Sequence, residues 1–174
     1  MQNKNLKMRR VTLLLFTIYV LVMLFLLVIP NNYRGHNVLV GGLSWERWVS
    51  FVANGFNLVP FRGITEQIGS ILAGRDVARN VIYFCGNAIG FFPLGFFLPI
   101  LFEKQRKFSR FIAASVLAIM CIELLQLVTM RGSLDIDDVI LNAIGACLGF
   151  WVRQRIVNRV ISQEANERSQ KRED

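Results

Sequence analysis

The residues best placed to do chemistry lie in one segment of the second half of the chain, Arg131–Gly149. Taken as a helix, this segment places polar and small residues on one face, because they recur every three or four positions: Asp135, Asp138, Asn142, Gly145 and Gly149. The other faces carry branched aliphatic side chains that suit lipid. Polar side chains inside a membrane are costly and usually face a bundle interior or a cavity, so this stripe is the first candidate site.

Two other apolar segments carry polar side chains that would lie at a similar depth. Asn87, Glu123 and Asn142 would each lie roughly 10 Å below the outer surface, given a helix rise of about 1.5 Å per residue. Glu123 is the hardest to explain without a function, because an acid at that depth must be paired, hydrogen-bonded or protonated. The candidate substrate-binding residues are Asn87, Glu123, Gln126, Arg131, Asp135, Asp138 and Asn142. Glu123 and Asp138 are also the candidates for a catalytic role.

Several of these residues also have a purely structural interpretation. Asp135 and Asp138 could cap a helix, where an acid offsets the positive end of the helix dipole. Asn87 and Asn142 could form hydrogen bonds between helices. No cofactor is evident, and no protein metal site is expected, although two carboxylates could hold Mg²⁺ through their oxygens.

Membrane-spanning helices must position these side chains. The 174 residues are 53% apolar with a mean hydropathy of +0.43, and they contain apolar runs close to the ~20 residues that cross a hydrocarbon core. The runs predict four transmembrane helices at about 11–29, 81–102, 111–130 and 136–152. The expected fold is an all-α polytopic membrane protein, a four-transmembrane-helix bundle in one domain over residues 1–174. The spacings Gly86-x3-Gly90 and Gly145-x3-Gly149 predict surfaces for close helix packing.

The basic residues follow the pattern of cytoplasmic segments. They cluster before the first apolar run, between the second and third runs, and in the tail 153–174. Both termini are then cytoplasmic, and residues 30–80 form the outer segment. The net charge of +8 could also suggest nucleic acid, but no binding motif accompanies it, so no nucleic-acid partner is expected.

The outer segment is predicted to hold helices of its own. Residues 43–52 mix Trp45 and Trp48 with charged residues at helical spacing, which favours a short helix lying on the outer surface. Residues 57–62 predict a turn, because Pro60 favours an extended residue before it. Residues 66–80 could form a second amphipathic helix. The tail after Val160 is expected to be a frayed helix or disordered.

The cysteines and the single histidine fit no known chemical pattern. Cys85, Cys121 and Cys147 lie within predicted spans, and their spacing matches neither a zinc site nor a disulfide framework. His36 has no serine or cysteine motif near it, so a His-based catalytic triad is not expected.

Three groups of residues carry a resemblance to a known family. The first is Asn57-Leu58-Val59-Pro60-Phe61, and the second is Asn87-x4-Phe92-Pro93-x-Gly95-x2-Leu98-Pro99. The third is Glu123-x2-Gln126, followed by Arg131, Asp135-Ile136-Asp137-Asp138, Asn142, Gly145 and Gly149. In this order they are similar to the motifs of VanZ-like membrane proteins. The resemblance covers residues 57–149 and implies a multi-pass protein of the bacterial cell membrane.

The resemblance also implies a function in antibiotic resistance. The founding member of the family confers resistance to the glycopeptide teicoplanin without the cell-wall precursor replacement that is used against vancomycin. Together with the polar layer, this favours an outer-leaflet polar pocket that binds a lipid-linked cell-wall precursor or the lipoglycopeptide itself.

Two other hypotheses remain open. In a membrane enzyme acting on an envelope lipid, Glu123 could be a general base, Asp135 and Asp138 could hold Mg²⁺, and Arg131 could orient a phosphate. A small transporter or scaffold is the other hypothesis, and the glycine faces leave a homo-oligomer possible. The inner half of the membrane has no comparable polar layer, which makes an alternating-access pathway hard to build.

Overall fold

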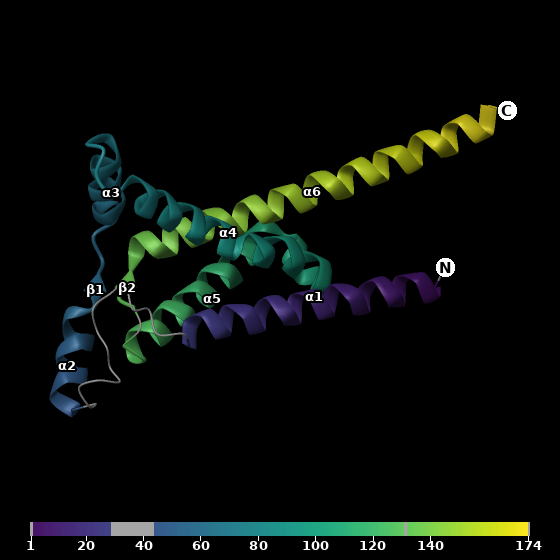
Figure 1. Cartoon of the computed structure of the whole chain (residues 1–174). Helices are drawn as coiled ribbons and strands as arrows, with labels where there is room; N and C mark the ends of the chain where they lie inside the picture. Colours follow the sequence, from purple (N-terminus) through teal and green to yellow (C-terminus); the bar gives the residue numbers. More distant parts are fainter. Residues whose placement is uncertain (1, 29–43, 131, 174) are drawn as a thin grey trace.

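The computed structural model describes residues 2–28, 44–130 and 132–173, and these residues are mostly helical (Figure 1). The elements in chain order are α1 (Gln2–Val28), α2 (Trp45–Asn54), β1 (Phe56–Asn57), α3 (Arg62–Leu72), α4 (Val77–Leu101), the 3-10 helix η2 (Glu103–Arg106), α5 (Phe108–Val128), β2 (Leu134–Asp135) and α6 (Ile136–Glu173). Within the described ranges, three helices are long and apolar enough to cross a membrane: α1, through Arg9–Leu26, α4 and α5. They coincide with the first three predicted spans.

The fourth predicted span lies in α6 and stays a prediction. α6 begins at Ile136, as expected, but its first turn carries two acids, and Arg153 follows its apolar stretch. The helix then continues to Glu173, so the tail is helical rather than disordered.

The long helices lie lengthwise against one another. α6 packs along α4 and α5, and α1 lies against α4. Both chain ends lie at one end of these helices, whereas α2, α3 and the two short strands lie at the opposite end (Figure 1). The core between α4, α5 and α6 is apolar and aromatic, formed by Phe91, Phe111, Ile119, Val139, Ala146 and Phe150. Most large apolar side chains of α1 are exposed, as a lipid-facing helix requires.

Glycines allow α4 and α6 to approach each other closely. A Cβ atom built on any of three glycines would overlap with the backbone of the facing helix: Gly95 with Ala146, Gly145 with Ala88, and Gly149 with Phe92. Only residues without a side chain permit such a distance between two helices. The predicted packing surface at Gly145 and Gly149 is therefore confirmed.

The other predicted glycine surface is wrong. Gly86 and Gly90 of α4 have no neighbouring atoms within 4 Å of an added Cβ, so neither supports close helix packing. The α4 face that meets α6 lies further along the helix and uses Gly95 instead. The Gly90 carbonyl has a different role, because it accepts a hydrogen bond of 3.0 Å from the Tyr19 hydroxyl of α1.

The described residues between α1 and α4 agree with the sequence in part. α2 occupies the position of the first predicted short helix. The second helix, expected over residues 66–80, begins and ends earlier, at Arg62 and Leu72. Gly74 and Asp76 then adopt left-handed φ angles of 69° and 48°, which stop the helix before α4 begins at Val77.

Residues 132–135 are not helical, although the polar stripe was derived by taking Arg131–Gly149 as one helix. β2 pairs in parallel with β1, with Phe56 opposite Leu134 and Asn57 opposite Asp135. The Leu134 backbone N–H donates to the Gly55 carbonyl at 2.8 Å. This pairing extends the chain until Asp135, so the helical face proposed from the sequence begins only at Ile136.

Candidate functional site

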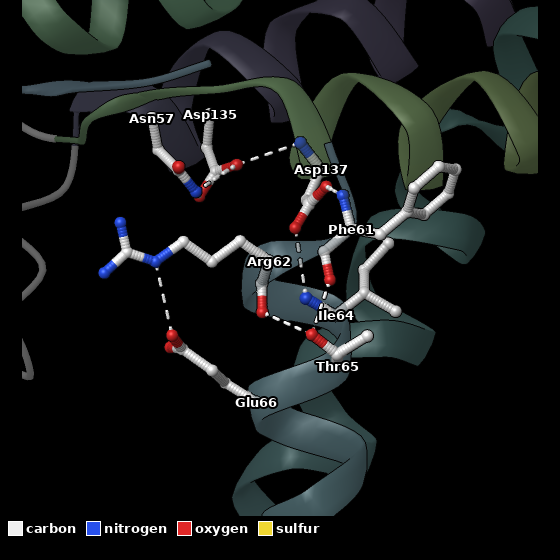
Figure 2. A network of polar contacts seen from close by, with 8 residues as sticks. All are labelled: Asn57, Phe61, Arg62, Ile64, Thr65, Glu66, Asp135 and Asp137. Atoms are coloured by element: carbon white, nitrogen blue, oxygen red, sulfur yellow. Dashed lines mark hydrogen bonds and ion pairs between the residues drawn. The ribbon is translucent and has the colours of Figure 1, made fainter. Parts of the chain in front are cut away.

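The site begins where the two short strands meet, outside the helical bundle. Asn57 Nδ2 donates to both carboxylate oxygens of Asp135, at 3.2 and 3.1 Å (Figure 2). Asp135 Oδ1 also accepts the backbone N–H of Asp137 at 2.9 Å, as an N-cap residue does at the start of a helix. Asp135 is therefore the cap of α6, which is the structural interpretation of this residue, and it does not lie on the helical stripe.

Asp137 connects α6 to the start of α3. Its side chain is fully buried, at 0% exposed. Its carboxylate accepts the backbone N–H groups of Phe61 at 2.5 Å and Ile64 at 3.1 Å (Figure 2). Phe61 is the N-cap position of α3, has a left-handed φ of 64°, and makes no capping bond with its own side chain. A carboxylate from α6 thus satisfies the free N–H groups of a helix that is distant in the chain.

Asp138 faces the opposite way, toward α4. Its Oδ1 accepts hydrogen bonds from the Tyr83 hydroxyl and from Asn87 Nδ2, the latter at 3.2 Å. The consecutive acids 137 and 138 therefore hold different helices, and together they join α3, α4 and α6 at the end of the bundle that carries α2 and α3 (Figure 1).

Glu123 and Asn142 form a second polar contact one turn further along α6. Both are buried between α5 and α6, at 2% exposed each. Asn142 Nδ2 lies 3.4 Å from Glu123 Oε1, a long hydrogen bond. The Asn142 Oδ1 atom is buried and has no hydrogen-bond partner among the described residues. The acid predicted inside α5 therefore faces α6 and not lipid.

The structure gives the other candidates different places. Gln126 is half-buried, and its backbone carbonyl accepts from Gly132 N at 3.1 Å. No side-chain hydrogen bond of Gln126 is found within the described part of the chain. Arg131 lies outside the described residues, as does His36.

Sequence reasoning missed Asp137 and Tyr83. Tyr83 could have been found, because it precedes Asn87 by four residues and so lies on the same face of α4. Asp137 lies within the third family motif but off the polar stripe, and its partners lie 73 and 76 residues away, so helical spacing did not select it.

The polar side chains of the site are arranged as hydrogen-bond partners of one another. In the described ranges, no group of three or more His, Cys, Asp or Glu side chains could hold a metal ion. Asp135 and Asp138, the two acids considered for Mg²⁺, contact different partners, Asn57 and the Tyr83–Asn87 pair. Carboxylates and amides placed in this way can accept hydrogen bonds from hydroxyl and amide groups.

A comparison with known families agrees with the motifs. A family model described as VanZ/LLP1 matches residues 16–157. The matched stretch includes every site residue described above. No curated protein and no solved structure matches the chain.

Proposed function

Because the chain belongs to the VanZ/LLP1 family, we propose that it is a bacterial cell-membrane protein that protects against lipoglycopeptides such as teicoplanin. The protection would come from the polar layer near the outer-segment end of the bundle. The ligand would be a lipid-linked cell-wall precursor or the lipoglycopeptide itself, since both combine a lipid tail with sugars and peptide bonds.

The buried Glu123–Asn142 contact is the observation that supports this proposal most directly. A charged or protonated carboxyl group inside an apolar helix is expensive, and a role in binding would explain its presence. Together with Asp138 and Asn87, these side chains offer carboxylate and amide oxygens, which suit sugar hydroxyls and peptide N–H groups. Because Glu123 and Asn142 are each 2% exposed, the ligand would reach them only when α5 and α6 separate at this end.

The membrane arrangement is part of the proposal. α6 would form a fourth span with its apolar stretch at about 136–152, beside α1, α4 and α5. Both termini would be cytoplasmic. The common position of the two chain ends and the basic residues at that end of the helices support this orientation (Figure 1).

The outer segment would lie in the membrane interface. α2 and α3 leave apolar side chains exposed, among them Trp45, Val49, Ile68 and Leu72. The turn between them exposes Leu58, Val59 and Phe61. Trp45 stacks on Trp48 with ring centroids 5.2 Å apart, and tryptophan rings favour the headgroup region. A surface of this kind would keep the polar layer next to lipid-anchored ligands.

Antibiotic susceptibility tests the proposal. A sensitive Gram-positive host would express the wild type, Glu123→Gln or Glu103→Gln at matched membrane levels. Glu103→Gln makes the same chemical change at an exposed residue of η2, at the other end of the bundle. We expect the wild type and Glu103→Gln to raise the inhibitory concentration of teicoplanin more than that of vancomycin, and Glu123→Gln to lose this effect.

Two results would contradict the proposal in different ways. A wild type that leaves teicoplanin susceptibility unchanged would place the function elsewhere. Protection that survives in Glu123→Gln and in Asp138→Ala would keep the resistance role but exclude the polar layer as its site.

A further inference from the structure

One basic side chain is buried at the end of the bundle where the termini lie. Arg153 of α6 follows the apolar stretch of the helix and is only 9% exposed. Its Nη1 donates to Gln154 Oε1 at 3.0 Å, a neutral partner on the same helix. Its Nε is buried and has no hydrogen-bond partner within the described residues. A buried guanidinium normally pairs with an anion, because leaving it unpaired is costly.

The neighbouring charge does not compensate Arg153. Burial lowers the pKa of Arg153, and the positive charge of Arg106 lowers it further. Glu103 Oε1 lies 3.6 Å from Arg106 Nη2, and the Glu103 side chain is 84% exposed. The acid therefore pairs with Arg106 at the surface. Arg106 of η2 is therefore a second positive charge that acts on Arg153, and within the described residues no acid is found as a partner of Arg153.

In the proposed membrane arrangement, Arg153 follows the fourth span and lies at the depth of a lipid headgroup. A cluster of rings lies just above it, with Phe108 packed against Phe150 at 5.5 Å and against Trp151 at 6.1 Å between ring centroids. Trp151 is exposed, as residues of an aromatic belt are at the boundary of the hydrocarbon core. Lys104 and Lys107 add positive charge on the adjacent link.

We propose that Arg153 and Arg106 form a binding site for a phosphate group at this end of the bundle. An arginine fork suits phosphate because it can donate two parallel hydrogen bonds, and the anion would neutralise the buried Arg153 while Arg106 adds attraction. An anionic phospholipid of the adjoining leaflet can supply the phosphate, and so can soluble phosphate. This site is separate from the polar layer at the other end, so it does not depend on the proposed resistance function.

Native mass spectrometry of the full chain in detergent tests the site. The protein is titrated with dioleoyl phosphatidylglycerol, with dioleoyl phosphatidylcholine or with inorganic phosphate. The variants are Arg153→Gln, Arg153→Lys, Arg106→Gln and the control Arg159→Gln, which removes an exposed charge from the same helix. We expect the wild type to prefer the anionic lipid, and Arg153→Gln to bind it roughly tenfold more weakly. Arg153→Lys should lose less, and Arg159→Gln should change binding by less than about twofold.

The remaining outcomes distinguish a lipid phosphate from a soluble one, and a specific site from general attraction to a basic surface. Tight binding of inorganic phosphate that Arg153→Gln removes would identify a soluble anion as the ligand. Equal losses in Arg153→Gln and Arg159→Gln would overturn the proposal, because they would indicate only general attraction to a basic surface. If Arg153→Gln does not accumulate, Arg106→Gln decides, since Arg106 is half exposed and its removal leaves no cavity. Unchanged lipid binding in that variant would also overturn the site.

Discussion

Asp137 Oδ1 lies 2.5 Å from the backbone nitrogen of Phe61, which precedes it by 76 residues. The second oxygen of the same carboxylate accepts from Ile64 at 3.1 Å, so one side chain of α6 binds two backbone N–H groups at the N-terminus of α3. A Cβ added to Gly63 would lie 3.2 Å from Asp137 Oδ2, so the glycine leaves room for the carboxylate. The turn at residues 57–62 is therefore shaped to receive this acid.

Replacement of Asp137 should destabilise the protein. In Asp137→Ala the two N–H groups of α3 lose their acceptor, which should lower the free energy of unfolding by about 1–3 kcal/mol. Asp137→Asn keeps one carbonyl oxygen and should lose less. The measurement is denaturant unfolding of the purified protein in mild detergent. Glu66→Ala is the control, because the exposed Glu66–Arg62 pair should contribute under about 1 kcal/mol. Equal effects of Asp137→Ala and Glu66→Ala would show that the cap contributes nothing.

The contact between Asn57 and Asp135 predicts that two substitutions of Asn57 differ in how their stability depends on pH. Asn57→Ala removes a donor, and we expect a loss of about 1 kcal/mol. Asn57→Asp places a second carboxylate about 3 Å from Asp135, so repulsion should add to that loss near neutral pH. Lowering the pH should protonate one of the two acids and recover part of the stability of Asn57→Asp but not of Asn57→Ala. Thermal melting of both variants across pH 4–8 checks this, and parallel pH profiles would contradict it.

The sequence predicted the long helices well because their signal is local. Apolar runs and the charge between them identify α1, α4 and α5 from composition alone. Glu123 and Asn142 were predicted to lie at one depth, and in the structure Asn142 Nδ2 lies 3.4 Å from Glu123 Oε1. This prediction needed only the direction of each helix, which follows from the order of the spans, and the rise per residue.

The remaining parts of the site depend on contacts between distant segments. The expected stripe included Asp135 because a helical period was assumed to begin at Arg131. The pairing of β2 with β1 holds Asp135 outside the helix instead, and β1 lies 78 residues earlier. The roles of Asp137 and Asp138 likewise depend on which helix packs on which side of α6. The spacing of residues within α6 does not predict this packing.

The close approach of α4 and α6 predicts opposite effects of the same substitution at different glycines. Gly95→Ala and Gly149→Ala add a methyl group where a Cβ would overlap with the facing backbone, so the helices must separate. We expect both to lower the free energy of unfolding by more than about 2 kcal/mol. Gly86→Ala meets open space and should be neutral or stabilise by up to about 1 kcal/mol, because alanine favours the helix. Unfolding in detergent measures all three, and a tolerated Gly149→Ala would contradict the packing.

The Tyr83–Asp138 hydrogen bond should couple α4 to α6. Tyr83→Phe keeps the ring and removes the hydroxyl, so the Asp138 carboxylate loses one donor while Asn87 still reaches it at 3.2 Å. The variant should be about 1 kcal/mol less stable than the wild type. A double-mutant cycle with Asp138→Ala, which removes the acceptor, separates this bond from other effects, and the coupling energy should be of similar size. Additive losses would show that the two side chains do not interact.

α2 should be held against the bundle by one indole group. Trp48 Nε1 donates at 2.9 Å to the carbonyl of Val128, the last residue of α5, where helix carbonyls lack partners within the helix. Trp48→Phe keeps an aromatic ring but cannot donate, so α2 should detach more often. Hydrogen exchange of the α2 backbone amides should become roughly five- to tenfold faster, if the bond contributes about 1 kcal/mol. Trp45→Phe is the matched control, because Trp45 is exposed and its nitrogen makes no hydrogen bond to the described part of the protein. Equal exchange in the two variants would mean that ring contacts hold α2, and the indole hydrogen bond does not.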